Sequence, residues 1–172
     1  MVMGLAQSKG ATVFDAHERV LPAPPEVVGA LLDRLGSEDD PIWPSDRWPA
    51  LELDKPLGEG ARGGHGPIRY HVVEYDPGRF VRFRFSAPPG FLGHHEFIVE
   101  RAGDGAALLR HVVVLAPMGD ARYMWPLVWR PLHDALIEDA LDRAEAAVTG
   151  RTPPRHEWSW WVRVLRRLMG RR

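Results

Sequence analysis

Histidine is the residue type in this sequence with the widest chemical scope. The chain of 172 residues contains eight histidines and no cysteine. An imidazole can bind a metal ion, transfer a proton near neutral pH or hydrogen-bond a ligand. Four histidines occupy positions that we expect to face one interior: His71, His95 and His111 on predicted strands, and His133 on a predicted helix. They are the first candidates for a functional site.

Two interpretations of these histidines are open. If all four converge, they could hold a metal ion or poise a proton-transfer site. None shows the local spacing of a metal motif such as H-E-x-x-H, and the adjacent His94 and His95 cannot both point inward from a strand. We therefore expect these imidazoles to line a ligand pocket, with no metal site and no cofactor.

Arg69 is the charged candidate at the same site. If it points inward, it must be paired, and it could bind a ligand carboxylate or stabilise an enolate. The alternative is an arginine whose stem packs at the sheet edge while its head stays in water. Both interpretations remain open at this stage.

Several other chemistries are excluded by composition or context. The absence of cysteine rules out a thiolate nucleophile and Cys-ligated metal sites. No serine lies in a G-x-S-x-G elbow. Residues 58–63 (GEGARG) match G-x-G-x-x-G, but Pro67 and a predicted strand follow instead of a helix, so we reject nucleotide binding. We expect residues 56–67 to form a flexible loop that could gate a cavity.

The elements that must position these residues are short strands followed by one long helix. Apolar residues recur at helical spacing through residues 119–149, and Gly150 ends the pattern. Before it we expect strands at 11–21, 51–54, 68–75, 79–86, 91–101 and 106–116, and a helix at 26–35 after Pro25. Short hairpin turns make the sheet antiparallel, so the fold class is α+β.

Strand alternation predicts which side chains point inward. Arg82 and Arg84 should face water, which turns Phe83 and Phe85 to the interior; the same argument places His95, Phe97 and His111 inside. On strand 68–75, Glu74 as the outward marker puts Arg69, His71 and Val73 inside. A bulge would reverse that assignment, since Ile68, Tyr70 and Val72 are the more apolar set.

The order of elements and three local stretches resemble the START-like superfamily, also called SRPBCC or polyketide cyclase/dehydrase-like proteins. The stretches are residues 20–28 (VLPAPPEVV), 73–79 (VEYDPGR) and 131–142 (PLHDALIEDALD). The resemblance covers roughly residues 12–150 and implies a helix-grip fold, in which a curved antiparallel sheet of about seven strands wraps the C-terminal helix. It also implies a cavity between them that binds sterols, lipids, polyketides or hormones in some members and cyclises polyketides in others.

The C-terminal tail is predicted to be a separate module. Residues 150–172 carry seven Arg and one Glu, so with a whole-chain charge of -1 the tail is +6 and the body is -7. On a helix, the tail's apolar residues share one face, which is typical of an interfacial membrane helix. The interpretation that the acidic body favours is a helix docked on that body or on a partner. The candidate contact residues are Trp158, Trp161, Arg163, Arg166 and Arg167.

These observations lead to one favoured hypothesis and two alternatives. We expect a START-like domain at residues 1–151 that binds a small hydrophobic molecule, followed by the tail at 152–172. The expected ligand-binding residues are Arg69, His71, Phe83, Phe85, His95, Phe97, His111, Trp125, Trp129 and His133. The alternatives are a cyclase or dehydratase in which Arg69 stabilises an enolate and a histidine moves protons, and a membrane-associated interaction protein that acts through its tail.

The expected location follows from what the sequence lacks. No signal peptide is recognisable in residues 1–10, and no window is long and apolar enough for a membrane span. We expect a cytoplasmic protein, with the tail permitting peripheral attachment to the inner membrane face. Nucleic-acid binding is not expected, because the arginine cluster is short and the acidic body would repel phosphate.

Overall fold

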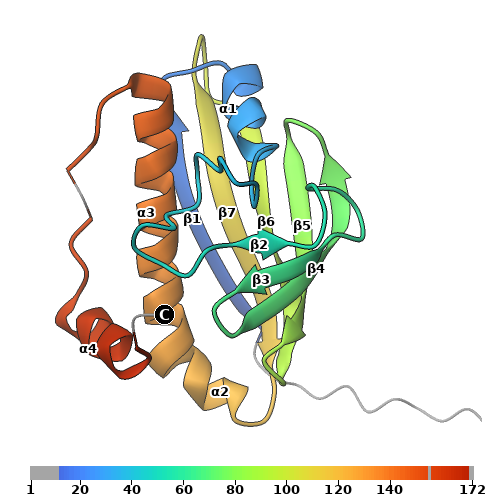
Figure 1. The fold of residues 1–172 in the computed structure, drawn as a ribbon, viewed down its shortest axis with the longest axis vertical. Helices are drawn as coiled ribbons and strands as arrows, with labels where there is room; N and C mark the ends of the chain where they lie inside the picture. The colour runs from blue at the N-terminus through green and yellow to red at the C-terminus, as the bar shows by residue number, and fades with distance from the viewer. Residues whose placement is uncertain (1–11, 155, 171–172) are drawn as a thin grey trace, which may run out of the picture.

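A seven-stranded antiparallel sheet forms one layer of the protein, and helices cover one of its faces (Figure 1). The computed structural model describes residues 12–154 and 156–170. The strands lie in the order β1-β7-β6-β5-β4-β3-β2. Their bounds are β1 Val13–Leu21, β2 Glu52–Leu53, β3 Arg62–His65, β4 Ile68–Asp76, β5 Phe80–Ala87, β6 Phe91–Arg101 and β7 Ala107–Pro117.

One long helical run crosses the sheet, as the sequence predicts. It consists of α2 (Ala121–Met124), a π-helical turn η1 (Trp125–Trp129) and α3 (Arg130–Thr149), and Gly150 ends it in the left-handed conformation. In the π-helical turn, the Arg130 N–H donates to the carbonyl of Trp125, five residues back. Such turns are frequent at functional sites, and this one brings two tryptophans to the sheet.

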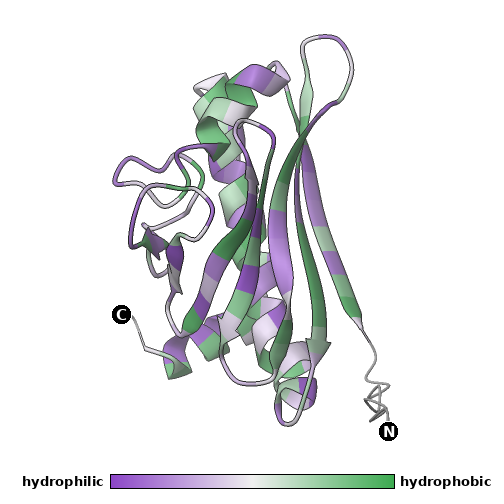
Figure 2. Ribbon diagram, turned by 90° about the vertical axis from the view of Figure 1, so that its right-hand side faces the viewer, coloured by the Kyte–Doolittle hydropathy of each residue, from purple (hydrophilic) through white to green (hydrophobic). Residues whose placement is uncertain are grey.

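The core lies between the inner face of the sheet and this helical run. Figure 2 shows hydrophobic and hydrophilic segments alternating along the strands, as expected for a sheet with one wet face. Helix α3 buries an apolar face made of Leu132, Leu136, Ile137, Ala140, Leu141 and Ala144. The strands oppose it with Val81, Phe83, Phe97, Leu109, Val113 and Leu115. Helix α1 (Pro25–Leu32) closes one end of the sheet.

The predicted α+β class and the predicted order of elements along the chain are confirmed, with one omission. The predicted loop at residues 56–67 contains strand β3, which pairs with β2 and β4. A Cβ on Gly63 would lie 1.8 Å from the Glu52 carbonyl oxygen, and one on Gly64 would lie 1.9 Å from that of Ile68. The two glycines are there because the neighbouring strands approach too closely for a side chain. The same glycine-rich composition is typical of loops, so this strand was predicted as a loop.

The tail forms helix α4 (Trp160–Leu168), which packs on the body beside α3. Ser159 caps it by accepting a hydrogen bond from the Val162 N–H. None of the helices in the described part of the chain has the length and apolar character needed to span a bilayer. Residues 1–10, which were interpreted as lacking a signal peptide, lie outside the described residues, as do the last two residues of the tail. The domain boundary at residue 151 stays a prediction.

Candidate functional site

A cavity of about 870 Å³ lies between the inner face of the sheet and the helical run. Strands β3 to β7 supply one wall, and η1 and α3 supply the other. Most of the lining is apolar or aromatic, including Phe85, Phe91, Val113, Trp125, Trp129 and Leu136. The volume falls within the range of about 300–1,000 Å³ that is usual for small-molecule sites.

Three of the predicted histidines meet in this cavity. His95 on β6, His111 on β7 and His133 on α3 all line it. His95 Nδ1 and His111 Nε2 lie 3.3 Å apart, and the ring centroids of His111 and His133 are 5.0 Å apart. The strand pairing explains the first contact, because His95 is opposite Val113 and so lies diagonal to His111.

Burial keeps the two strand histidines neutral. His95 is 6% exposed and His111 is 2% exposed. Burial lowers the pKa of each well below the usual 6.5, and the neighbouring imidazoles add to the effect. A third cavity histidine, His65 on β3, behaves similarly, since burial lowers its pKa to about 3. The cavity wall is therefore polar but uncharged at these positions.

Several buried polar atoms in the wall have no hydrogen-bond partner among the described residues. They include His95 Nε2, His111 Nδ1, His133 Nε2 and Trp125 Nε1. A neutral imidazole has one N–H and one lone pair. Since one of His95 Nδ1 and His111 Nε2 must donate to the other, the two remaining nitrogens have opposite roles: one is a donor and one is an acceptor.

The inward orientation predicted for Arg69 and His71 is wrong. Ile68, Tyr70 and Val72 are the buried set on β4, while Arg69 is exposed and His71 is only partly buried. The register shifts between Val72 and Glu74, which leaves Val73 as an extra residue. Because of this bulge, Val72 points inward although Glu74, two residues later, points outward. The outward direction of Glu74 therefore does not predict the directions of the residues before the bulge.

Arg69 nevertheless borders the cavity, whereas His71 does not. The Arg69 guanidinium donates to the backbone carbonyls of Gly66 and Ile68, at 2.6 and 2.8 Å. The exposed head fits the second interpretation of Arg69, although β4 lies inside the sheet and not at its edge. His71 pairs with Arg62 and Arg84 on neighbouring strands, on the face away from the cavity.

The predicted aromatic residues divide into lining and support. Phe85, Trp125 and Trp129 line the cavity. Phe83 and Phe97 point inward as predicted, but they are fully buried beneath the imidazoles and do not line it. Phe83 stacks on His95 with ring centroids 4.9 Å apart, and Phe97 meets the edge of His111 at 4.5 Å. They fix the orientation of the histidine rings.

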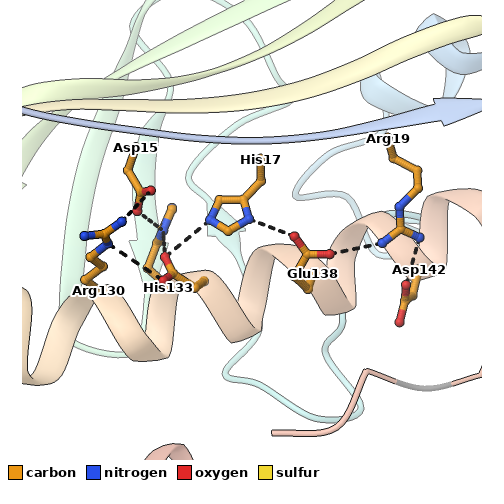
Figure 3. Close-up of polar contacts among 8 residues, drawn as sticks. Asp15, His17, Arg19, Arg130, His133, Glu138 and Asp142 are labelled. Carbon is orange, nitrogen blue, oxygen red and sulfur yellow. Dashed lines mark hydrogen bonds and ion pairs between the residues drawn. The ribbon is translucent and has the colours of Figure 1, made fainter. Parts of the chain in front are cut away.

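A charged seam between β1 and α3 was not predicted. Figure 3 shows Asp15, His17 and Arg19 of β1 pointing toward α3. His17 donates from Nδ1 to Glu138 at 2.8 Å and from Nε2 to Asp134 at 3.3 Å. Arg19 donates to Glu138, Asp142 and Glu145 at 2.8 to 3.1 Å. The sequence did contain a signal for this seam. Acidic residues recur at spacings of three and four on α3, and two basic residues occupy alternate positions of β1.

The seam carries strongly perturbed ionisations. Hydrogen bonds to Asp134 and Glu138 raise the pKa of His17 to about 9, against the opposing effect of burial. Although burial opposes it, ion pairs with His133 and His17 hold the pKa of Asp134 below its usual range. Asp15 is 7% exposed, and its Oδ2 lies 3.6 Å from His133 Nδ1. His133 therefore joins the seam to the cavity.

Comparison with solved structures identifies the fold. A truncated norcoclaurine synthase from Thalictrum flavum matches with a TM-score of 0.64 at 14% identity, covering 86% of this chain and 99% of that one. CalU16 from Micromonospora echinospora matches with a TM-score of 0.56 at 14% identity, covering 94% of both chains. This is the START-like fold. A conserved protein of unknown function from Enterococcus faecalis, EF2215, matches with a TM-score of 0.61 at 16% identity, covering 90% and 82%.

These likenesses concern the fold alone. No family model and no curated protein matches the sequence. The START-like fold accounts for the position of the cavity between sheet and helix. The particular side chains that line it must be considered for this chain alone.

The C-terminal tail extends the START-like fold of this chain by packing across it. Val162 and Leu165 are 3% and 5% exposed, and the Trp161 Nε1–H donates to the Leu127 carbonyl at 2.8 Å. Arg166 and Met169 border the cavity. Of the sequence alternatives for the tail, these contacts are those of docking on its own body, although Trp160 and Leu168 remain exposed.

A buried carboxylate anchors the tail and the loop before β2 to α3. Asp139 is 3% exposed and accepts hydrogen bonds from Trp48 Nε1 at 2.7 Å and Trp158 Nε1 at 3.0 Å. It also accepts from Arg47, whose guanidinium stacks on Trp158. The sequence placed Asp139 off the apolar face of the helix. Its role depends on partners 92 and 19 residues away along the chain.

Proposed function

We propose that this protein binds a small, largely apolar molecule that carries one or two neutral polar groups. The observation that carries the proposal is the pairing of an apolar cavity of about 870 Å³ with buried imidazole and indole nitrogens that have no hydrogen-bond partner in the described part of the chain. Apolar burial at about 25 cal/mol per Å² would supply most of the affinity. Hydroxyl or carbonyl groups on the ligand would satisfy the buried nitrogens and so fix its orientation.

The chemistry of the wall narrows the ligand class. Because His95 and His111 are neutral, the deep end of the cavity offers no charge to a carboxylate. One nitrogen of this pair donates and the other accepts, which suits a hydroxyl group, since a hydroxyl does both. The indole N–H of Trp125 suits a carbonyl or ether oxygen. Phenols, hydroxylated polyketides and sterol-like alcohols share this pattern.

A solved relative in fold gives the proposal a precedent. The norcoclaurine synthase of Thalictrum flavum has been solved in complex with dopamine and hydroxybenzaldehyde, and it matches this chain with a TM-score of 0.62 at 12% identity. Both molecules have an aromatic body with polar substituents. A ligand of that general kind fits the lining described above.

The first test is binding of the apolar fluorophore N-phenyl-1-naphthylamine to the protein purified without detergent. We expect saturable binding at one site per chain. Val113→Trp adds bulk inside the cavity and should weaken binding at least tenfold, whereas Leu92→Trp adds the same bulk at a position that is 55% exposed and should not. Equal affinity in the Val113→Trp variant and the wild type would show that the probe binds elsewhere.

A second measurement addresses the polar groups. Trp125→Phe removes the indole N–H while keeping an aromatic ring in the wall. Displacement of the fluorophore by a phenol such as 4-hydroxybenzaldehyde should weaken about fivefold or more in this variant, because a net hydrogen bond contributes about 1 kcal/mol. Affinity for the fluorophore should change less. Native mass spectrometry of the untreated protein, followed by organic extraction, would then identify any co-purifying ligand.

A cyclase or dehydratase activity is the second candidate, and one contact favours it. His133 lines the cavity while its Nδ1 lies 3.6 Å from the buried Asp15 carboxylate, an arrangement that can orient an imidazole for proton transfer. The enolate role expected for Arg69 has no such support, because its guanidinium is held by the backbone carbonyls of Gly66 and Ile68 at the turn between β3 and β4. Turnover of an extracted ligand that is lost in His133→Gln while fluorophore binding persists would establish this candidate over simple binding.

A further inference from the structure

Four potential metal ligands converge where β1 packs against α3. Asp15 and His17 come from the strand, and His133 and Asp134 come from the helix. One ligand atom from each lies within 4.8 Å of all the others. We propose that these four side chains bind one divalent transition-metal ion, with Zn²⁺ as the best match. This goes beyond ligand binding in the cavity and does not depend on it.

Three of the distances among the four ligand atoms match those of a tetrahedral site, and every pair lies within 4.8 Å. Zinc binds histidine nitrogen and carboxylate oxygen at about 2.0–2.2 Å, so neighbouring ligands of a tetrahedral ion lie roughly 3.3–3.5 Å apart. His17 Nε2 is 3.3 Å from Asp134 Oδ1, and His133 Nδ1 is 3.5 Å from the same oxygen. Asp15 Oδ2 lies 3.6 Å from His133 Nδ1. A small closure of the strand onto the helix is all that coordination requires.

The surroundings of His17 provide an independent observation. A metal-binding histidine usually donates its other N–H to a carboxylate, which fixes the ring and raises its basicity. His17 Nδ1 does this to Glu138 at 2.8 Å, leaving Nε2 to face the cluster. Glu138 is held in turn by Arg19 at 3.1 Å. The seam therefore presents both a ligand set and its supporting shell.

Asp15 supplies a second independent observation. The residue is 7% exposed, and its Oδ2 accepts no hydrogen bond in the part of the chain that the structure describes. A buried carboxylate oxygen without a donor is costly, so it calls for a positive partner. His133 Nδ1 stands 3.6 Å from Oδ2, and the Arg130 guanidinium stands 3.7 Å from the other oxygen, Oδ1; both distances are beyond hydrogen-bond length. A cation coordinated by Oδ2 would satisfy it.

The charge and position of the cluster suit a structural ion. An ion would displace the proton that His17 Nε2 donates to Asp134. Two carboxylates and two neutral imidazoles would then balance a divalent charge, and four protein ligands make a closed site. β1 is an edge strand, so the ion would fasten that edge to α3. Asp134 is 38% exposed, which gives an ion access from solvent. Because His133 also lines the cavity, the ion would fix its ring there too.

Arg130 is the competing cation at this site. Its guanidinium lies 3.7 Å from Asp15 and 3.9 Å from Asp134, and its side chain is 54% exposed. The length of both contacts and the exposure of the side chain mean that Arg130 can withdraw toward solvent when an ion binds. Its positive charge should nevertheless weaken metal binding. The Arg130→Ala variant is therefore expected to bind the ion more tightly than the wild type.

The test begins with the full chain, without a histidine tag, stripped with EDTA and dialysed against Zn²⁺. We expect one zinc per chain by elemental analysis, and a Co²⁺ derivative with the visible absorption of a tetrahedral site. Zn²⁺ at a hundredfold excess over its Kd should raise the folded-to-unfolded ratio about a hundredfold. A wild-type protein that retains no stoichiometric zinc and gains no stability would overturn the proposal.

Variants locate the site. His17→Gln and Asp15→Asn each remove one ligand and should weaken Zn²⁺ binding at least tenfold. His94→Gln, on the opposite face of β6, is the matched control and should bind normally. Undiminished zinc binding by His17→Gln would place the ion elsewhere and overturn the assignment. Should both ligand variants fail to fold, Arg130→Ala decides: a several-fold gain in affinity supports the site, and an unchanged affinity contradicts it.

Discussion

Acidification from pH 7 to pH 5 should destabilise the folded protein by about 5 kcal/mol through the buried imidazoles of the cavity wall. Burial lowers the pKa of His95 and His111 well below 6.5 and that of His65 to about 3, so the folded state takes up almost no proton there in this interval. The unfolded chain does, because its histidines titrate near 6.5. Each group therefore contributes stability that is complete above the unfolded pKa and is lost as the pH falls toward the folded one.

The magnitude follows from proton linkage. Between pH 7 and pH 5, each such histidine costs about 2 kcal/mol, and the three together cost about 6 kcal/mol. His17 acts in the opposite sense, because its folded pKa is raised to about 9. Its stabilisation is complete only below about pH 6.5, so acidification adds about 1 kcal/mol. The net loss of about 5 kcal/mol equals the low end of the 5–15 kcal/mol that is typical of whole domains.

Urea denaturation at pH 7.0 and pH 5.0, with EDTA present to exclude metal effects, measures this directly. The midpoint should fall by roughly 2–3 M. His95→Phe and His111→Phe keep an aromatic ring and remove one titrating group each, so each should reduce the pH-dependent loss by about 2 kcal/mol, whatever its effect at pH 7. His94→Gln, outside the cavity, should leave the pH dependence unchanged.

Two results would refute the reasoning. One is an equal wild-type midpoint at both pH values, which would mean that these imidazoles accept protons in the folded state. The other is a double variant lacking both histidines that retains the full acid loss, which would assign the effect to carboxylates. Either result would also remove the argument that the deep end of the cavity is uncharged.

Three further predictions concern packing and the tail. Asp139→Ala should cost about 2–4 kcal/mol in urea unfolding, because it leaves the partly buried Arg47 guanidinium and two indole N–H groups without their acceptor; a loss under 1 kcal/mol would contradict this. Gly29→Ala should destabilise by about 1–3 kcal/mol, although alanine usually favours helices, because its Cβ would lie 2.1 Å from the Gly78 carbonyl oxygen. Gly58→Ala, whose nearest neighbour lies at 3.8 Å, is the control. Deleting residues 152–172 should speed N-phenyl-1-naphthylamine association in stopped flow, since tail residues border the cavity; unchanged kinetics would show that the tail does not cover it.

Much of the fold was predictable because local patterns agree with the tertiary structure. The apolar repeat through residues 119–149 needed only helical spacing, and the hairpin at Asp76–Gly78 needed only turn chemistry. Alternation alone turned His95 and His111 inward from β6 and β7, since those strands pair without register shifts. In such elements, each residue's environment is set by its near neighbours in the chain.

The candidate site was only half predictable, for a physical reason that differs from residue to residue. Arg69 and His71 were misplaced because one extra residue at Val73 shifts the alternation, and the apolar set of β4 gains more from burial. Phe83 and Phe97 were assigned correctly to the interior. Alternation does not tell whether an inward side chain lines the cavity or lies buried beneath the residues that line it. Asp15, His17 and Arg19 interrupt the apolar alternation of β1, and the sequence does not show what they contact. Their partners lie on α3, which only the tertiary structure brings next to β1.

What the sequence determined by itself was therefore the class of fold, the bounds of most elements and the inward direction of three cavity histidines. What only the tertiary structure decided was which polar groups meet. His17 and Glu138 are 121 residues apart in the chain, and Arg47 and Asp139 are 92 apart. Such pairs leave no periodic trace, because their spacing depends on how the strand edge and the helix pack. The cluster of Asp15, His17, His133 and Asp134 exists only through that packing.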